Sequence, residues 1–358
     1  MTDDKEIVDL RGKIDQIDDS LLALINERAR KAMKVGNKKP GQKADIVYRP
    51  EREAQILQRL QQANSGPLES VVVERLFREI ISACRAIEAK PSIATLGPDG
   101  TFSELATRKQ FGAEINLELT SSIEEVFRLV EAEHCDIGVV PVENSAEGGI
   151  HLTLDRLLTT SLKICGEIDL RIKHCLIGSA ESASPIRVLA HQQALAQCRQ
   201  WLDVNLPSID RVACASNSDA VRQILDDPTS VAIASEEAAE AYGLQVLHAD
   251  IEDQPGNTTR FLVLGRHTVQ ASGQDKTSLV MSAQERPGAL HTLLAPLSEH
   301  NINMTRVESR PSRTGLWEYM FFIDLEGHVQ DANVDSALSQ IKRNAAMFKI
   351  LGSYPRSV

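Results

Sequence analysis

The chain has 358 residues, 42% of them apolar and 25% charged, which is the composition of a globular protein of about two or three domains. Its formal net charge of -11 argues against a nucleic-acid binder, because that role needs clustered Lys and Arg to neutralise phosphates. The start of the sequence is charged and no run of about 18 apolar residues follows, so we expect neither secretion nor a membrane span. We therefore predict a cytoplasmic protein that acts on small molecules.

The six cysteines are scattered along the chain without a CxxC pair, and most of them stand in apolar segments. Reduced thiols in such surroundings pack as small hydrophobic side chains. We expect neither a disulfide framework nor a zinc site, and no other metal.

Two stretches have the composition of domain boundaries. Ala89-Lys90-Pro91 ends a long helical pattern, and residues 267–274 (HTVQASGQ) are mostly small and polar, as in linkers. The chain is therefore expected to form three domains, residues 1–90, 91–267 and 275–358.

The first segment has the pattern of three helices. Its apolar residues follow one another in alternating steps of three and four: Ile7, Leu10, Ile14, Ile17, Leu21 and Leu24. This spacing predicts a helix with a heptad seam that runs to about Lys39, followed by helices from Pro50 to Ala63 and from Leu68 to Ala89. The first helix would be roughly 50 Å long. Two shorter helices cannot cover that length, so we expect a second subunit to cover the seam.

Charged side chains interrupt the apolar faces of these helices. Arg28 occupies the seam itself, and Lys39, eleven residues later, returns to nearly the same face. Further polar residues recur at helical spacing in the second and third helices: Arg49, Arg52, Glu53, Cys84 and Glu88. These charges either are solvated and form salt bridges, or they hold an anionic ligand, since an unpaired buried charge is costly.

In the stretches DLRGKID, NERARKAMKVGNKK, RPEREAQIL and ISACRAIE, these residues resemble the all-helical chorismate mutases, which are intertwined dimers of three-helix chains. The resemblance implies that Arg28 and Arg11 of the partner subunit bind the substrate carboxylates. It also implies that Lys39 and Glu88 face the ether oxygen and that Glu53 binds the substrate hydroxyl. The remaining residues of the implied site are Arg49, Arg52 and Cys84.

The conversion of chorismate to prephenate suits such a site. It is a pericyclic rearrangement, which needs no nucleophile or base, only groups that hold a dicarboxylate compactly and stabilise charge on the ether oxygen. Arginines bind carboxylates through two parallel hydrogen bonds. Some family members carry Gln where this chain has Glu88, and a carboxyl group donates a hydrogen bond only when it is protonated. We therefore expect the mutase activity to fall as the pH rises.

The second segment alternates short β-rich runs with amphipathic stretches. The runs are SIATLG, NLEL, DIGVVPVEN, RVLA, RVACA, VAIAS and RFLVLG. This alternation predicts a doubly wound α/β domain, in which ligands bind where strands end and helices begin. At those ends stand LGPDGTFSELA, VPVENSAEGGI and CASNSDAVRQ. Their Gly, Ser, Thr and Asn residues either cap helices or present amides and hydroxyls to an anion.

Taken in order, GPDGTFSELA, VPVENSAEGGI, HQQALAQC, VAIASEEAA and NTTRFLVLG resemble the prephenate dehydratases. That family has two α/β lobes, like those of periplasmic ligand-binding proteins, with the substrate in the cleft between them. Two stretches depart from the family: Gln192 replaces a proline, and residues 216–220 (SNSDA) differ from a Ser-Thr-Ala-x-Ala pattern, which leaves the role of Ser218 open. The substrate-binding residues that the resemblance implies are Thr101, Ser103, Glu143, Asn144, Ser145, Thr259 and Arg260.

Prephenate becomes phenylpyruvate by losing carbon dioxide and hydroxide, and no metal or organic cofactor is needed. The enzyme must bind two carboxylates and help the hydroxide leave, and Thr259 is the expected catalytic hydroxyl. In a regular strand Thr259 and Arg260 face opposite sides. We place Thr259 in the cleft and Phe261 in the core, whereas Arg260 either binds a carboxylate or forms a structural pair. A Ser–His–Asp hydrolase is not expected, since no Ser or Cys stands in a triad-like relation to His134, His174, His248 or His267.

The last segment has the pattern strand, helix, strand, strand, helix, strand, from TSLVMSAQ at residues 277–284 to FKILGSY at residues 348–354. This order predicts a ferredoxin-like α+β fold. RPGALHTLL and VESRPSR resemble the ACT regulatory domain of prephenate dehydratases, in which phenylalanine binds at a subunit interface; residues 308–311 would otherwise be a strand that leads into a turn. The implied effector-binding residues are Gly288, Ala289, Leu290, Glu308, Ser309 and Arg310.

Together the segments predict an all-α domain, a two-lobed α/β domain and an α+β domain in one bifunctional enzyme. It would rearrange chorismate to prephenate and convert prephenate to phenylpyruvate, under feedback inhibition by L-phenylalanine. Two alternatives stay open: an enzyme that prefers arogenate, the transaminated analogue, and a non-catalytic amino-acid sensor. We expect a homodimer or a higher homo-oligomer.

Overall fold

The computed structural model describes residues 2–37, 48–179, 185–283, 286–311 and 319–357. Lys39, which is expected in the mutase site, lies outside these residues. The helices are α1 (Thr2–Asn37), α2 (Pro50–Ala63), α3 (Ser70–Glu88), α4 (Phe102–Phe111), α5 (Ile123–Glu131), α6 (His151–Thr159), α7 (Gln192–Gln197), α8 (Arg199–Asn205), α9 (Asn217–Gln223), α10 (Glu236–Tyr242), α11 (Ala289–Glu299) and α12 (Ala332–Asn344). The strands are β1 (Ser92–Leu96), β2 (Asn116–Thr120), β3 (Ile137–Asn144), β4 (Gly148–Gly149), β5 (Lys163–Arg171), β6 (Cys175–Gly178), β7 (Arg187–His191), β8 (Asp210–Cys214), β9 (Ser230–Ala234), β10 (Gln245–His248), β11 (Thr258–Gly265), β12 (Asp275–Ser282), β13 (Met304–Pro311), β14 (Tyr319–Glu326) and β15 (Met347–Pro355).

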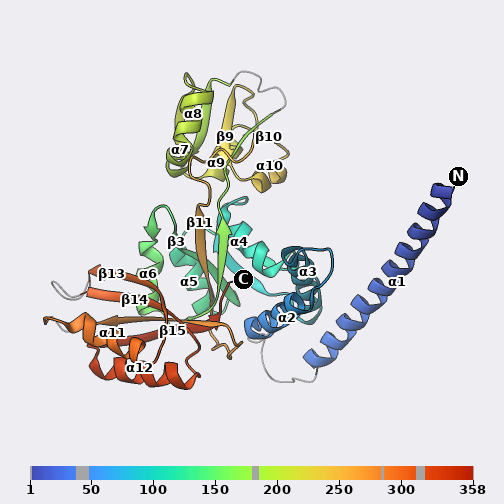
Figure 1. The fold of residues 1–358 in the computed structure, drawn as a ribbon. Coiled ribbons are helices and arrows are strands. Elements are labelled where there is room, and N and C mark those ends of the chain that lie inside the picture. Colours follow the sequence, from blue (N-terminus) through green and yellow to red (C-terminus); the bar gives the residue numbers. More distant parts are fainter. Residues whose placement is uncertain (1, 38–47, 180–184, 284–285, 312–318, 358) are drawn as a thin grey trace.

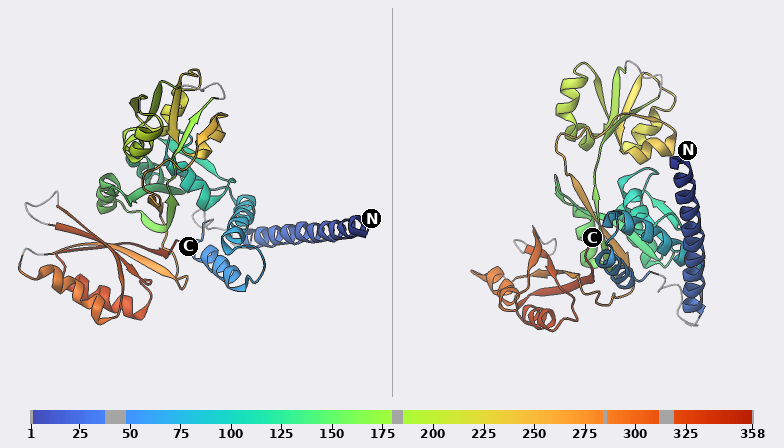
Figure 2. Two further views of the ribbon diagram at one scale, coloured as in Figure 1. Left: turned by 45° about the horizontal axis from the view of Figure 1, so that its top comes forward. Right: turned by 45° about the vertical axis from the view of Figure 1, so that its right-hand side comes forward.

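The first three helices follow local sequence signals. α2 starts at Pro50, whose fixed backbone suits a first turn, and it carries Glu51 and Glu53 near its positive end. α1 meets α3 near Arg28, and its N-terminal part extends away from the rest of the chain (Figures 1 and 2). Its predicted apolar seam is exposed, with Ile14 55% and Leu21 50% accessible. Neither α1 nor any other helix in the described part of the chain combines the length and apolar character that crossing a membrane requires.

The α/β domain has two lobes, each built on its own sheet. The sheet of the first lobe has the order β2-β1-β3-β11-β5, with the short β4 paired to β3. β1, β2 and β3 are parallel, as the alternation of strands and helices predicts, whereas β11 runs antiparallel between β3 and β5. Phe127 of α5 and Leu154 of α6 are buried against this sheet in one cluster with Val140.

The second lobe has the strand order β10-β6-β9-β7-β8. The chain crosses between the lobes twice, once after β5 and once before β11. The two crossing segments lie side by side, and the amide of Ile172 donates to the carbonyl of Asn257 at 2.7 Å. β11 thus joins the first lobe only after the second is complete. The sequence pattern missed four strands of this domain, β4, β5, β6 and β10. Both sheets also contain antiparallel pairs, which a doubly wound parallel sheet does not predict.

The third domain is an antiparallel sheet of order β13-β14-β12-β15, the order of the predicted ferredoxin-like fold. α11 and α12 pack together on one face of it (Figure 1). On the other face Phe322 and Tyr354 share a buried cluster with Val142 of the first lobe. β15 crosses β5 so closely that a Cβ on Gly352 would lie 2.1 Å from the carbonyl oxygen of Ile164. Only glycine allows this approach.

Candidate functional site

A cleft of about 840 Å³ lies between the two lobes of the α/β domain. Its lining comes from the start of α4 and the facing ends of β3 and β11 in the first lobe, and from the end of β7 and the start of α9 in the second. This volume falls within the range of about 300–1,000 Å³ that is usual for small-molecule sites. Four residues of the predicted dehydratase site line it: Thr101, Ser103, Asn144 and Thr259.

Thr259 is held in a defined orientation by Asn144. The two residues are directly opposite each other on β11 and β3, and both are buried. Asn144 Nδ2 donates to Thr259 Oγ1 at 2.8 Å, while Asn144 Oδ1 accepts from the amide of Ala146 at 2.9 Å. Because the backbone fixes the oxygen of Asn144, the threonine oxygen must act as the acceptor. The hydroxyl proton of Thr259 is therefore left to donate to a ligand in the cleft.

A second polar group of the lining lies where the chain crosses between the lobes. His174 Nε2 is 2.8 Å from Gln197 Oε1, and Asn257 Nδ2 donates to the same oxygen at 3.2 Å. Since an amide oxygen only accepts, His174 carries its proton on Nε2. Burial lowers the pKa of His174, which keeps the ring neutral. Ser145 extends this group, because its hydroxyl donates to Asn257 Oδ1 at 3.3 Å.

His174, Gln197 and Asn257 do not belong to the site predicted from sequence. The absence of a Ser or Cys partner excludes a hydrolytic role for His174, but it does not bear on ligand binding. Their position in the chain could have identified His174 and Asn257 as candidates, because both stand in the segments that join the lobes, where ligands often bind. His174 Nδ1, Gln197 Nε2 and Ser218 Oγ are buried and have no hydrogen-bond partner among the described residues. Such atoms require a polar ligand or water.

The start of α4 faces the cleft and suits an anion. Thr101 caps this helix, accepting from the amide of Glu104 and donating to the carbonyl of Leu96 at 2.9 Å. It therefore acts as a cap and also lines the cleft. Amides and the positive end of the helix dipole favour a carboxylate there. Arg222 is the one arginine or lysine among the described lining residues, and its guanidinium lies 3.5 Å from Asp219. Carboxylates in this cleft must therefore be bound largely by amides and hydroxyls.

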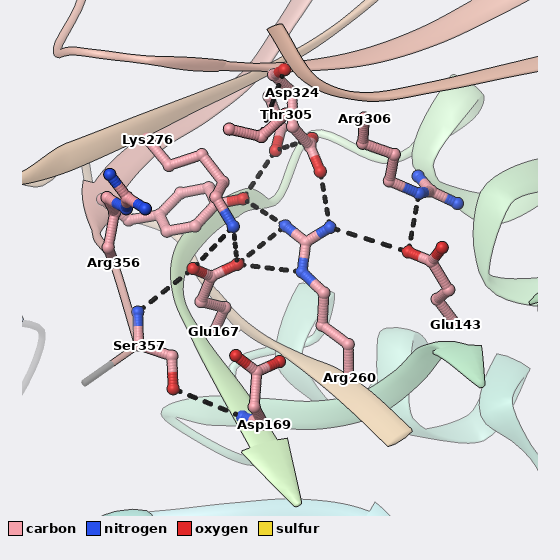
Figure 3. Close-up of polar contacts among 12 residues, drawn as sticks. Glu143, Glu167, Asp169, Arg260, Lys276, Thr305, Arg306, Asp324, Arg356 and Ser357 are labelled. Atoms are coloured by element: carbon pink, nitrogen blue, oxygen red, sulfur yellow. Dashed lines mark hydrogen bonds and ion pairs between the residues drawn. The ribbon is translucent and has the colours of Figure 1, made fainter. Parts of the chain in front are cut away.

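Arg260 and Glu143 do not line the cleft. As strand alternation predicts, Arg260 faces the side opposite Thr259, where it pairs with Glu167 at 2.8 Å and with Asp324 of the third domain at 2.5 Å (Figure 3). Glu143 pairs with Arg306 of the third domain at 2.8 Å. Of the two possibilities for Arg260, the structure therefore shows structural pairing. The expected part of both residues in substrate binding has no support in this geometry.

The described residues expected in the mutase site are spread over α1, α3 and the start of α2. Arg11 is exposed on α1, and Arg28 Nη1 donates to the carbonyl of Ile80 at 3.4 Å, where α1 meets α3. Arg52 and Glu88 are exposed, Arg49 is half-buried and Cys84 is buried.

Glu53 is already paired within the chain. Arg85, which the predicted site does not include, binds Glu53 at 2.6 Å and donates to the carbonyl of Phe111 at 2.9 Å. Ser82 donates to the same carbonyl at 2.5 Å. Burial raises the pKa of Glu53, and Arg85 opposes that rise. The α2–α3 hairpin is therefore docked on the first lobe, at the end of the helix whose start faces the cleft.

The expected effector residues lie at two places in the third domain. Gly288 precedes α11 with a φ of 75°, a left-handed conformation that glycine adopts readily, and Ala289 and Leu290 begin the helix. On β13 the side chain of Ser309 is exposed, whereas Glu308 and Arg310 are partly buried.

Glu308 and Arg310 contact the first lobe. Arg310 binds Asp155 at 2.7 Å, and a Cβ on Gly149 would meet the carboxylate of Glu308. Gly149 pairs with Glu143, the neighbour of Asn144. The strand expected to bind an effector therefore lies against the segment that carries a cleft residue.

Three families match this chain in succession. They are chorismate mutase type II over residues 10–89, prephenate dehydratase over residues 93–269 and the ACT domain over residues 277–343. The bifunctional chorismate mutase/prephenate dehydratase of Pseudomonas aeruginosa is 46% identical over 364 residues and covers 100% of both chains. That of Neisseria gonorrhoeae is 48% identical over 363 residues, covering 100% of this chain and 99% of the relative.

A solved structure resembles the chain in fold. It is the prephenate dehydratase of Arthrobacter aurescens in complex with L-Phe, with a TM-score of 0.69 and 35% sequence identity. The match covers 74% of this chain and 90% of that one.

Proposed function

The chain belongs to the bifunctional chorismate mutase/prephenate dehydratases, and we propose that the cleft between its lobes is the dehydratase site, with Thr259 as the catalytic hydroxyl. The observation that carries the proposal is the hydrogen bond from Asn144 to Thr259. It fixes the direction of donation, so that the threonine proton is available to the substrate.

The reaction asks for one well-placed donor. The ring carboxylate leaves as carbon dioxide, the electrons of the broken C–C bond enter the ring, and the C–O bond across the ring breaks. Hydroxide is a poor leaving group, so a donor at this oxygen lowers the barrier. Thr259 donates a hydrogen bond that stabilises the growing negative charge. The proton that completes the product water comes from solvent, because a threonine hydroxyl is too weak an acid to give up its own.

Both lobes take part in holding the substrate. The start of α4, with Ser103 beside it, binds one carboxylate through amides and hydroxyls. Gln197 and Ser218 belong to the second lobe and have buried polar atoms without partners among the described residues. They supply donors for the other carboxylate. A molecule bound to both lobes is oriented at Thr259.

The mutase site is formed by two chains of a homodimer. Arg28 sits where α1 meets α3, whereas Arg11 and the apolar seam of α1 are exposed in a single chain. Covering that seam with α1 of a second copy buries it and brings Arg11 of the partner subunit to the site. Together with Lys39, these cations stabilise the compact dicarboxylate.

The third domain makes L-phenylalanine an inhibitor of the dehydratase. Support comes from the L-Phe complex of the Arthrobacter enzyme. It comes also from Glu308 and Arg310, whose side chains extend from the expected effector strand to the first lobe.

We place the enzyme in the cytoplasm. All six of its cysteines are free, as is usual where thiols are kept reduced.

Arogenate is the second candidate substrate. It carries an ammonium group where prephenate has a ketone, and two carboxylates of the lining, Asp99 and Asp219, are suited to a cation. Prephenate remains the first choice, because Asp219 already binds Arg222 and the side-chain amide of Gln223.

The test is turnover of the purified full chain with chorismate, prephenate or arogenate, for the wild type, Thr259→Ala and Thr258→Ala. The adjacent Thr258 offers the same side chain outside the cleft lining. We expect Thr259→Ala to abolish conversion of prephenate and to leave conversion of chorismate intact, while Thr258→Ala keeps both activities. Conversion of prephenate by Thr259→Ala at the wild-type rate would refute the catalytic role. A higher rate with arogenate than with prephenate would make arogenate the preferred substrate.

A further inference from the structure

The side of β11 opposite the cleft carries a closed cluster of charges. Arg260 donates from Nε to Glu167 Oε2 at 2.8 Å, from Nη1 to Asp324 Oδ2 at 2.5 Å and from Nη2 to the hydroxyl of Tyr354 at 3.0 Å. Lys276 contributes a second cation, with Nζ 2.7 Å from Glu167 Oε2. Figure 3 shows the guanidinium at the centre of this cluster. Glu167 belongs to the first lobe, whereas Asp324, Tyr354 and Lys276 belong to the third domain.

The cluster is buried and satisfied, so its geometry is tightly fixed. The side chains of Glu167, Asp324 and Arg260 are only 2%, 6% and 12% exposed. Ser278 donates to the other oxygen of Asp324 at 2.5 Å. Buried ion pairs are held firmly only when further hydrogen bonds satisfy both partners, and this one meets that condition.

The cluster adjoins both polar residues that meet in the cleft. Arg260 follows Thr259 on β11, and Glu143 precedes Asn144 on β3, opposite Arg260 in the register. Glu143 Oε2 lies 3.9 Å from Arg260 Nη1. The register between β11 and β3 shifts immediately after Arg260. Such bulges redirect side chains and often stand beside active sites.

β11 pairs regularly with β5 from Thr258 to Val263, but on the β3 side regular pairing stops directly after Arg260, so the pairing of Thr259 with Asn144 ends at this break. A one-residue slip would turn Thr259 away from the cleft. The guanidinium of Arg260 binds β5 on one side and the third domain on the other, and so opposes such a slip.

We infer that Arg260 is a positioning residue for the dehydratase reaction, which holds Thr259 against Asn144 beside the bulge in β3, and that Asp324 of the third domain completes this hold. The inference rests on the proposed role of Thr259. The third domain then helps to hold the cleft in place. A displacement of β14 would move the hydroxyl of Thr259 through the side chain of Arg260.

The test compares Arg260→Met, Arg260→Lys, Asp324→Asn and the double variant Arg260→Met/Asp324→Asn in the full chain. Glu326→Gln is the matched control, since Glu326 lies two residues from Asp324 on the same face of β14 but forms an exposed pair with Arg356. For each variant, kcat and KM for prephenate are measured separately, together with mutase activity and thermal unfolding.

Arg260→Met is expected to lower the dehydratase kcat about 100-fold with KM nearly unchanged, because loss of alignment of this kind affects the reacting geometry more than binding. Arg260→Lys recovers only part of the rate, since an ammonium group cannot bind both carboxylates in the manner of a guanidinium. Asp324→Asn lowers kcat about 10-fold, and the double variant is no slower than Arg260→Met, because residues of one network are not additive. Glu326→Gln and all mutase rates stay at the wild-type level.

A wild-type kcat in Arg260→Met, equal rates for Asp324→Asn and Glu326→Gln, or additive effects in the double variant would overturn the inference. If Arg260→Met does not fold, the contrast between Asp324→Asn and Glu326→Gln decides alone. Thr259→Ala separates the two proposals. If Thr259→Ala still converts prephenate, both the role of Thr259 and this inference are refuted. If Thr259→Ala is inactive but Arg260→Met has normal turnover, only this inference is refuted.

Discussion

Asn144 and Thr259 face each other across β3 and β11, and the asparagine amide donates to the threonine hydroxyl at 2.8 Å. The direction of this bond, and not its mere presence, gives Thr259 a proton to offer in the cleft. An isosteric change that reverses the direction therefore tests the mechanism more sharply than removal of either side chain.

Asn144→Asp is that change. A carboxylate only accepts hydrogen bonds, so Thr259 would donate to Asp and have no proton left for the substrate. We expect the dehydratase kcat to fall about 100-fold or more, as is usual when a hydrogen-bond donor to developing charge is lost. Thr259→Ala combined with Asn144→Asp should be no slower than either change alone. Steady-state assays with prephenate measure both effects, and additive losses would contradict a shared role.

The pair Glu53–Arg85 leads to a prediction on stability. Arg85→Met would leave the carboxylate of Glu53 buried without its cation, and breaking a buried pair in this way costs about 3–5 kcal/mol. It would also remove the bond to the carbonyl of Phe111 that docks α3 on the first lobe. Urea unfolding of the full chain measures the loss. Arg128→Met is the control, because Arg128 forms an exposed pair with Glu125, and the two variants should differ clearly in their unfolding midpoints.

His174 predicts how stability depends on pH. Burial lowers its pKa in the folded chain, so at mildly acidic pH the unfolded chain binds a proton that the folded chain does not. The stability that comes from the neutral ring is present above the unfolded pKa of about 6.5 and is lost as the pH falls below it. His174→Gln should flatten the decline of the unfolding midpoint between pH 7 and pH 5. The exposed His134, changed to Gln, should leave the decline unchanged, and equal pH profiles for His174→Gln and the wild type would contradict this assignment.

Local signals predict much of this fold. Pro50 and the end of the apolar pattern at Ala63 give the bounds of α2 as the structure has them. The alternation of strands and helices gives the order of the third domain. Strand alternation likewise separates Thr259 from Arg260 before any partner is known, because side chains of neighbouring strand residues face opposite sides.

Remote partners explain what local signals miss. β5 carries Glu167 and Asp169, charges that weaken its strand pattern, and Glu167 forms ion pairs with Arg260 and with Lys276, which lies in another domain. His174 and Gln197 likewise are 23 residues apart in the sequence and meet only when the chain folds. A charge or polar group satisfied from far along the chain looks the same in the sequence as one that is solvated.

Gly352 provides a prediction on how the third domain is docked. Gly352→Ala would place a methyl group 2.1 Å from the carbonyl oxygen of Ile164, and since the obstacle is backbone, β15 and β5 must separate. We expect a lower unfolding midpoint and faster proteolysis between the first lobe and the third domain. Gly12→Ala is the control, because a Cβ there meets nothing within 4 Å and alanine favours a helix by about 1 kcal/mol over glycine. Equal proteolysis of both variants would show that the two domains tolerate a wider gap.

The exposed seam of α1 predicts that mutase activity depends on assembly whereas dehydratase activity does not. Ile14→Glu and Leu21→Glu together place two charges on the seam and should prevent a second α1 from covering it, because a buried unpaired carboxylate is costly. Sedimentation velocity should detect a smaller particle, and the double variant should lose mutase activity, since Arg11 of the partner subunit no longer reaches the site. Dehydratase activity should persist, because the cleft forms between the two lobes of a single chain. Gln16→Glu, an exposed position on α1 outside the seam, should change neither measurement. An unchanged mass together with full mutase activity in the seam variant would contradict a dimer built on α1.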